Sequence, residues 1–225
     1  MPTRRMRYRN LIACCYVLLL SVGATPELAA QPAKTQAANN QAAKAHSSTQ
    51  VRWDQERLRT ILEQEVIQVS RIAAHPVLVT AVVAQNAQNL TMLEIGRRDE
   101  MWQSSADNES LKLSMLNSVA AEFLRSLVGA GSSYTEAFIT DAQGANVAVA
   151  PLTSDYWQGD EDKFRKVTEV PGGVVFIGPM EWDESSNFNS VQISVPIKQG
   201  DVVIGVMVVG VKLSHILARQ LEDMR

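Results

Sequence analysis

Residues 136–151 read EAFITDAQGANVAVAP, and this stretch decides the fold class. Two short runs, each with the alternation or the apolar content of a strand, flank the turn-forming segment Ala142–Gly144. A glycine-containing turn between two such runs predicts a β-hairpin. The expected strands are Glu136–Asp141 and Asn146–Pro151.

Three more strands are expected downstream of the hairpin. They are Val174–Gly178, Val191–Lys198 and Val202–Val211, and a tight turn at Gln199-Gly200-Asp201 joins the last two. The polar stretch from Thr153 to Thr168 contains three aromatic residues and predicts a loop with a short helix. A short amphipathic helix is expected to close the chain.

Upstream of the hairpin, apolar residues recur at helical spacing. The pattern predicts helices from Trp53 (with Asp54 as N-cap) to Ala73, from Val77 to about Leu93, and from Leu111 to Leu127, with a break at His75-Pro76. The charged residues 97–100 and the polar residues 105–108 are expected between helices. Helices followed by antiparallel strands predict an α+β fold, with long N-terminal helices on a five-stranded antiparallel sheet and a short C-terminal helix.

The first 30 residues are typical of an export signal. Arg4, Arg5, Arg7 and Arg9 precede an apolar run, Leu11 to Ala24, that is shorter than the about 20 residues of a membrane span. Small residues follow, so we expect cleavage after Ala30 or after Ala24. An uncleaved membrane anchor is the alternative, whereas Cys14 lies too early in the run for a lipoprotein.

If the export signal is removed, the mature chain consists of a linker and one domain. Residues 31–51 have no apolar periodicity and predict a disordered linker. Residues 52–225 are expected to form one periplasmic or secreted domain, with a helical part at 52–130 and a sheet at 134–212. Both cysteines lie in the signal, so the mature domain should contain no disulfide and no thiol site.

The charge of the mature chain excludes one class of partner. After removal of residues 1–30, 17 Lys and Arg and 23 Asp and Glu remain, so the net charge is −6. A mildly acidic surface is a poor match for nucleic acid or for anionic membranes. We therefore expect no nucleic-acid partner.

Several segments, taken in order, resemble the extracytoplasmic PAS-like Cache sensor domains. They are Phe138–Gly144, Thr153–Glu161, Gln192–Ile197 and Val203–Val206, preceded by helices with Ala74–Leu78 and Gln85-Asn86. The resemblance implies long helices on one face of a PAS-like sheet and a pocket on the other. It also implies binding of a small extracellular metabolite and signal transduction through a partner. The chain lacks the Arg-x-Trp element of the amine-binding subset, so the ligand class stays open among amino acids, amines and carboxylates.

The candidate ligand-binding residues lie in the long loop and on one side of the sheet. Aromatic rings offer stacking area and carboxylates can hold an ammonium group. In the alternative interpretation the aromatic residues anchor the loop on the core, the aspartates cap its turns and the strand residues face solvent. The candidates are Asp155, Tyr156, Trp157, Asp160, Phe176, Gln192 and Ser194.

No pattern in the sequence predicts catalysis. His46, His75 and His215 lack the spacing of metal ligands, and Ser154-Asp155 has no nearby histidine. Trp182, Asp183 and Glu184 are expected in a solvated loop before the fourth strand. We expect no enzyme, no cofactor and no metal.

The predicted function is that of an exported, non-catalytic, small-molecule-binding sensor domain. With no output domain of its own, it would act through a membrane signalling protein. Homodimerisation is left open. The alternative is a structural or interaction module that dimerises through its N-terminal helix and binds no ligand.

Overall fold

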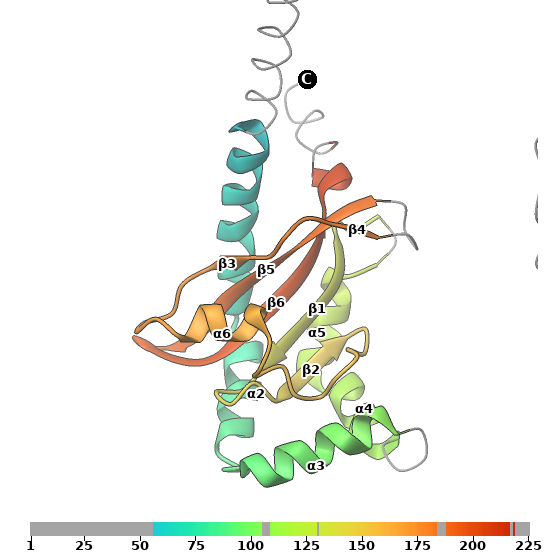
Figure 1. Cartoon of the computed structure of the whole chain (residues 1–225), viewed down its shortest axis with the longest axis vertical. Coiled ribbons are helices and arrows are strands. Elements are labelled where there is room, and N and C mark those ends of the chain that lie inside the picture. The colour runs from blue at the N-terminus through green and yellow to red at the C-terminus, as the bar shows by residue number, and fades with distance from the viewer. Residues whose placement is uncertain (1–55, 105–108, 130, 184–187, 217, 219–225) are drawn as a thin grey trace, which may run out of the picture. The chain divides into compact units, whose positions relative to one another are not determined.

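The computed structural model describes residues 56–104, 109–129, 131–183, 188–216 and 218 (Figure 1). The predicted signal peptide, the linker, the Asp54 cap, the 105–108 loop and the end of the last helix lie outside these residues. The described part is α+β, with helices first and an antiparallel sheet after them, as predicted.

The sheet contains all five predicted strands. Their order is β2-β1-β6-β5-β3, every neighbouring pair is antiparallel, and the PAS-like α+β fold is confirmed. The strands are β1 (Tyr134–Thr140), β2 (Asn146–Ala150), β3 (Phe176–Ile177), β5 (Phe188–Gln199) and β6 (Val202–Lys212).

One strand was not predicted. β4 (Glu181–Asp183) pairs with β5, so Trp182 and Asp183 lie in a strand rather than in a loop, and Glu184 lies outside the described residues. The prediction was wrong because the long strand β5 begins three residues before the expected Val191 and offers a pairing edge there.

The helical part begins with the N-terminal helix, Glu56–Ala73, and α2, Pro76–Asn86, which are bent by 61° relative to each other. The break occurs at His75-Pro76, as predicted. His75 caps α2, since its Nδ1 accepts a hydrogen bond from the Val77 N–H at 3.3 Å. In the described part of the chain, no single helix has the length and apolarity of a membrane span, although this bent pair together meets that test.

The expected helix from Val77 to Leu93 is in fact divided. α2 ends at Asn86, Asn89 adopts a positive φ of 50°, and α3 (Met92–Gln103) then begins. Thr91 and Glu94 form a capping box that starts α3, with Thr91 N–H donating to Glu94 Oε2 at 2.8 Å. The prediction that residues 97–100 lie between helices was therefore wrong, because they lie inside α3.

The expected helix from Leu111 to Leu127 is also divided. α4 (Glu109–Asn117) and α5 (Val119–Leu127) meet at Ser118, whose Oγ accepts a hydrogen bond from Ala121 N–H at 3.1 Å. A serine N-cap inside an apolar repeat ends one helix and begins another without disturbing the periodicity. α6 (Asp162–Thr168) is the short helix expected in the long loop.

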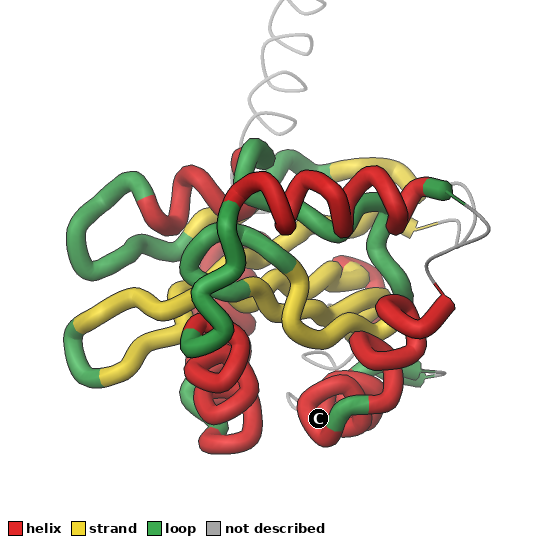
Figure 2. The backbone as a smooth tube through the Cα atoms, turned by 90° about the horizontal axis from the view of Figure 1, so that it is seen from below, coloured by secondary structure: helices red, strands yellow, loops and turns green. Residues whose placement is uncertain are grey.

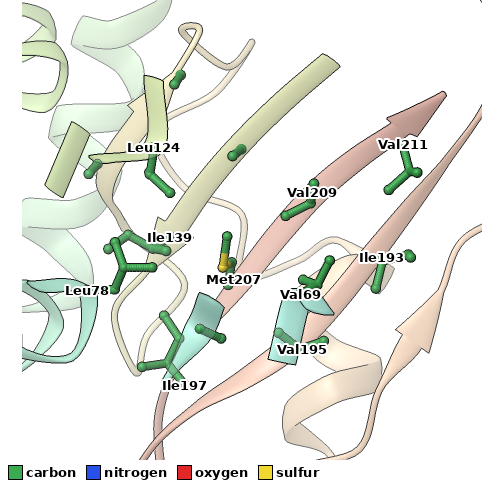
Figure 3. Close-up of a cluster of buried hydrophobic side chains, with 14 of the residues drawn as sticks. Val69, Leu78, Leu124, Ile139, Ile193, Val195, Ile197, Met207, Val209 and Val211 are labelled. Carbon is green, nitrogen blue, oxygen red and sulfur yellow. The ribbon is translucent and has the colours of Figure 1, made fainter. Parts of the chain in front are cut away.

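Both faces of the sheet are covered. The helical face packs against the N-terminal helix, α2 and α5, whereas α6 and the loop 151–161 cover the opposite face, here called the loop face (Figures 1 and 2). Figure 3 shows the core of the helical face, where side chains from three helices meet those of the strands. They include Val69, Leu78, Leu124, Ile139, Ile193, Val195, Met207 and Val209.

The approach of α2 to the sheet depends on a glycine. Asn86 at the end of α2 donates to the Ile204 carbonyl at 2.8 Å and accepts from Ala142 N–H at 3.0 Å. A Cβ added at Gly205 would overlap the Thr140 carbonyl oxygen and lie 3.0 Å from Val82 Cγ1. Only glycine fits between β1 and α2 at this point.

We predict that Gly205→Ala lowers the free energy of unfolding by about 1–3 kcal/mol, because overpacking forces the backbone to move. Urea denaturation followed by circular dichroism measures the change. Gly96→Ala is the control, since nothing lies within 4 Å of a Cβ at this position in α3. It should raise stability by about 0.5–1 kcal/mol, as alanine favours helix. Equal stability of the two variants would contradict the predicted close approach.

Candidate functional site

The three predicted strand residues do not enclose a metabolite. Phe176 lies opposite Ser194 in the pairing of β3 with β5, and its ring packs against the loop-face core. Ser194 is fully buried, and its Oγ has no hydrogen-bond partner in the described part of the chain. Gln192 Nε2 donates to Glu136 Oε1 at 2.8 Å. Gln192 and Glu136 line a cavity of about 80 Å³, well below the about 300 Å³ of small metabolite pockets.

The loop face itself is filled by side chains. Phe138 from β1, Tyr156 from the loop, and Phe164 and Val167 from α6 form one buried cluster. Lys163 Nζ lies 5.5 Å from the centre of the Phe138 ring. The face on which the resemblance places a pocket is therefore an apolar core in this structure.

Helix α3 fastens the long loop. Asp99 Oδ1 accepts hydrogen bonds from the backbone N–H groups of Tyr156, at 2.8 Å, and Trp157, at 2.9 Å. Trp102 Nε1 donates to the Thr153 carbonyl at 2.9 Å. These contacts hold the loop segment against one side of α3, where a carboxylate satisfies two backbone donors that would otherwise be unpaired.

The remaining predicted loop residues point in different directions. Asp155 Oδ1 accepts from Gln103 Nε2 at 3.0 Å, at the end of α3. Trp157 Nε1 donates to the Gln143 carbonyl at 2.8 Å, which ties the loop to the β1–β2 turn. Asp160 is exposed. Asp155 and Trp157 thus make separate contacts, and neither of these two hydrogen bonds involves Asp160.

Tyr156 is the predicted residue with the most informative surroundings. It is fully buried, and its ring is tilted against that of Trp102 with centroids 5.9 Å apart. Its hydroxyl oxygen accepts hydrogen bonds from Gln85 Nε2 and from Arg98 Nη1, both at 3.3 Å. Burial raises the pKa of the Tyr156 hydroxyl, an effect that the Arg98 guanidinium opposes.

The polar contacts continue from Tyr156 to the sheet. Gln85 lies close enough to Asp141 to lower the pKa of its carboxyl, and Asp141 Oδ1 accepts the N–H groups of Gln143 at 2.9 Å and Ala145 at 3.0 Å. Burial raises the pKa of the Asp141 carboxyl, although these hydrogen bonds oppose the shift. Arg98, Tyr156, Gln85 and Asp141 form what we call the buried polar network. It connects α3, the loop, α2 and the β1–β2 turn.

A larger cavity adjoins this network. It lies between α2, α3, α4 and β2 and has a volume of about 680 Å³, which is within the range of small-molecule sites. Its lining includes Gln85 from α2, Gln88 just after the end of α2, Arg98 from α3, Met115 from α4 and Val147 from β2. We call it the helical pocket. None of the seven predicted site residues lines it, but Tyr156 contacts two residues that do.

Sequence reasoning missed the helical pocket for a definable reason. Arg98 was expected between helices, so the direction of its side chain was unknown. One signal was present in α2, where small or polar residues recur at positions 81, 84 and 85, on one side of the helix. Among the described residues, no group of three or more His, Cys, Asp and Glu side chains is placed to hold a metal ion.

We predict that Asp99→Ala lowers the free energy of unfolding by about 1.5–3 kcal/mol, because two buried backbone N–H groups lose a charged acceptor. Urea denaturation measures the loss. Glu100→Ala, at the exposed neighbouring position of α3, is the matched control and should change stability by less than about 0.5 kcal/mol. A small effect of Asp99→Ala would show that α3 does not fasten the loop.

Comparison with known proteins gave matches only among solved structures. No protein-family model matches the chain, and no curated protein matches it. The sensor domain of the V. cholerae histidine kinase DctB is similar to it with 15% sequence identity and a TM-score of 0.40, over 79% of this chain and 59% of that one.

Two further similar structures come from other bacterial signalling proteins. A domain of a sensory box/GGDEF family protein from Vibrio parahaemolyticus is 14% identical, with a TM-score of 0.41, over 75% of this chain and 60% of that one. The ligand-binding domain of the Pseudomonas aeruginosa amino acid chemoreceptor PctC, in complex with GABA, is 11% identical, with a TM-score of 0.33, over 70% and 63%. The chain thus spans less than two thirds of the length of these three structures. The first is a sensor domain of a histidine kinase and the third is a ligand-binding domain of a chemoreceptor.

Proposed function

We propose that this chain is an exported, non-catalytic sensor domain of the periplasm that binds a small metabolite and acts through a membrane signalling protein. The observation that carries the proposal is the helical pocket, together with the buried polar network behind it. A pocket of about 680 Å³ accommodates a small metabolite. The network gives the pocket a direct connection to the sheet.

The position of the pocket suits a sensor. Helices that are separate in sequence border it, so a ligand that contacts all of them would alter how they pack. His75 joins the start of α2 to the end of the N-terminal helix. The N-terminal helix is attached to the sheet through Glu65, which accepts a hydrogen bond from the Tyr134 hydroxyl. Movement of α2 would therefore reach the helix that leads toward the N-terminus.

The chemistry of the lining supports binding rather than catalysis. Among the described residues that line the helical pocket, the polar groups are amides, hydroxyls and one guanidinium, with no carboxylate, imidazole or thiol. A general acid–base pair or an activated nucleophile normally needs one of those groups.

A second candidate function is an interaction module without a ligand. It is favoured by the loop face, where Phe138, Tyr156 and Phe164 are packed together in a buried cluster. It is also favoured by Ile67, which exposes 52% of its surface on the N-terminal helix and would suit a contact with a second copy.

Thermal-shift screening of the purified protein against amino acids, carboxylates and amines tests the first proposal. At about 100 times its dissociation constant, a specific ligand should stabilise the folded state by about 2.7 kcal/mol and raise Tm accordingly. The absence of any shift, combined with a Tm that rises with protein concentration, would instead support the interaction module.

A further inference from the structure

We infer that the helical pocket binds an organic carboxylate with an apolar body, and that Arg98 is the residue that holds its carboxylate group. The inference rests on the proposed function, since it names the ligand class and the recognition residue of that binding site. It is carried by three features of the described residues: the charge of the pocket, the free donors of Arg98 and the shape of the apolar lining.

The pocket carries a single charge. Arg98 is the one charged side chain among the described residues that line it. Within the described part of the chain Arg98 makes no ion pair within 4.0 Å, although five other ion pairs are present. A partly buried guanidinium without a counter-ion attracts an anionic ligand, because desolvation strengthens the interaction.

Two of the three carboxylates within four residues of Arg98 accept hydrogen bonds from other groups, and the third, Glu100, is exposed. Asp99 accepts the two backbone N–H groups of the loop. Glu94, one turn earlier on α3, is exposed and accepts hydrogen bonds from Thr91, although Arg98 contributes to lowering the pKa of its carboxyl. Neither side chain lines the pocket.

Arg98 retains donors for a ligand. The guanidinium has five N–H groups, and the hydrogen bond to Tyr156 uses one of them. The planar arrangement of the others fits the two oxygens of a carboxylate. Ser118, also in the lining, uses its Oγ as an acceptor for Ala121 N–H, which leaves its O–H able to donate.

The remainder of the lining selects the body of the ligand. Ala81 and Ala84 on α2 leave space, and Leu111, Met115 and Val147 provide apolar surface. No described lining residue is anionic, so an ammonium group would be desolvated without a partner. A carboxylate on an apolar body therefore fits better than a zwitterionic amino acid or an amine.

The same arginine gives binding a structural consequence. A carboxylate on Arg98 shares the guanidinium with the Tyr156 hydroxyl. Any change in that hydrogen bond reaches Gln85 and Asp141 through the buried polar network. Ligand binding between the helices would thus be communicated to the β1–β2 turn.

Three compounds with one skeleton test the ligand class: 3-phenylpropanoate, 3-phenylpropanamide and 3-phenylpropylamine. Isothermal titration calorimetry of the purified protein at low salt should give the carboxylate at least a tenfold lower Kd than the amide, and no binding of the amine. A charge-assisted hydrogen bond contributes about 1.5–3 kcal/mol, which corresponds to roughly a 10- to 100-fold change in affinity.

Variants then test the residue. Arg98→Gln should weaken binding of 3-phenylpropanoate at least tenfold, whereas Arg97→Gln makes the same charge change at an exposed position outside the pocket and should leave Kd unchanged. Ala84→Leu narrows the pocket without changing charge and should also weaken binding. It keeps the assignment testable if Arg98→Gln does not fold, as judged by circular dichroism.

Opposite results would overturn the inference. Equal affinity for the three compounds, or equal loss in Arg97→Gln and Arg98→Gln, would exclude Arg98 as the carboxylate contact. Stabilisation by amines alone in the thermal-shift screen would overturn the ligand class and leave the proposed sensor function standing. No binding of any compound in either assay would contradict both.

Discussion

The packing of the loop face depends on how helix α3 holds the loop 153–157. Asp99 accepts two backbone N–H groups of that loop, and Trp102 donates to its Thr153 carbonyl. A loop that crosses a sheet face must find partners for its backbone groups, since each unpaired buried donor costs about 1–3 kcal/mol. With these partners supplied by α3, Tyr156 is buried. Its ring packs in the loop-face core, and its hydroxyl accepts hydrogen bonds from Gln85 and Arg98.

This arrangement explains where the cavity lies. The aromatic ring of Tyr156 and those of Phe138 and Phe164 belong to the buried core of the loop face. The space is found on the other side of Tyr156, among helices whose facing residues are small, such as Ala81 and Ala84. The same side chain therefore packs in the loop-face core and contacts two residues that line the helical pocket, Gln85 and Arg98.

The sequence predicted the strands well and the helices only in outline. Strand ends are marked by turns with a distinct chemistry, such as Gly144 and Gly200, both of which adopt positive φ. The helix breaks at Thr91 and Ser118 are marked only by a capping side chain inside an apolar repeat, and periodicity alone passes over them. The helical pocket was missed for the same reason, because the direction of Arg98 depends on the cap at Thr91, which starts α3 seven residues earlier. Tyr156 contacts Arg98 and Gln85, which lie 58 and 71 positions earlier in the chain, and no local sequence pattern predicts such long-range contacts.

Tyr156 and Arg98 together suggest why a polar network is buried in this domain at all. An apolar residue at position 156 would complete the loop-face core at lower cost, since burying a hydroxyl requires partners for it. The Tyr156 hydroxyl links α2, through Gln85, to α3, through Arg98. Gln85 in turn lies near Asp141 in the β1–β2 turn. Gln85 and Arg98 both donate to the same Tyr156 oxygen. A ligand that bound Arg98 would therefore change the strength of the hydrogen bond from Gln85. In the proposed sensor, Tyr156 would therefore link binding among the helices to the sheet.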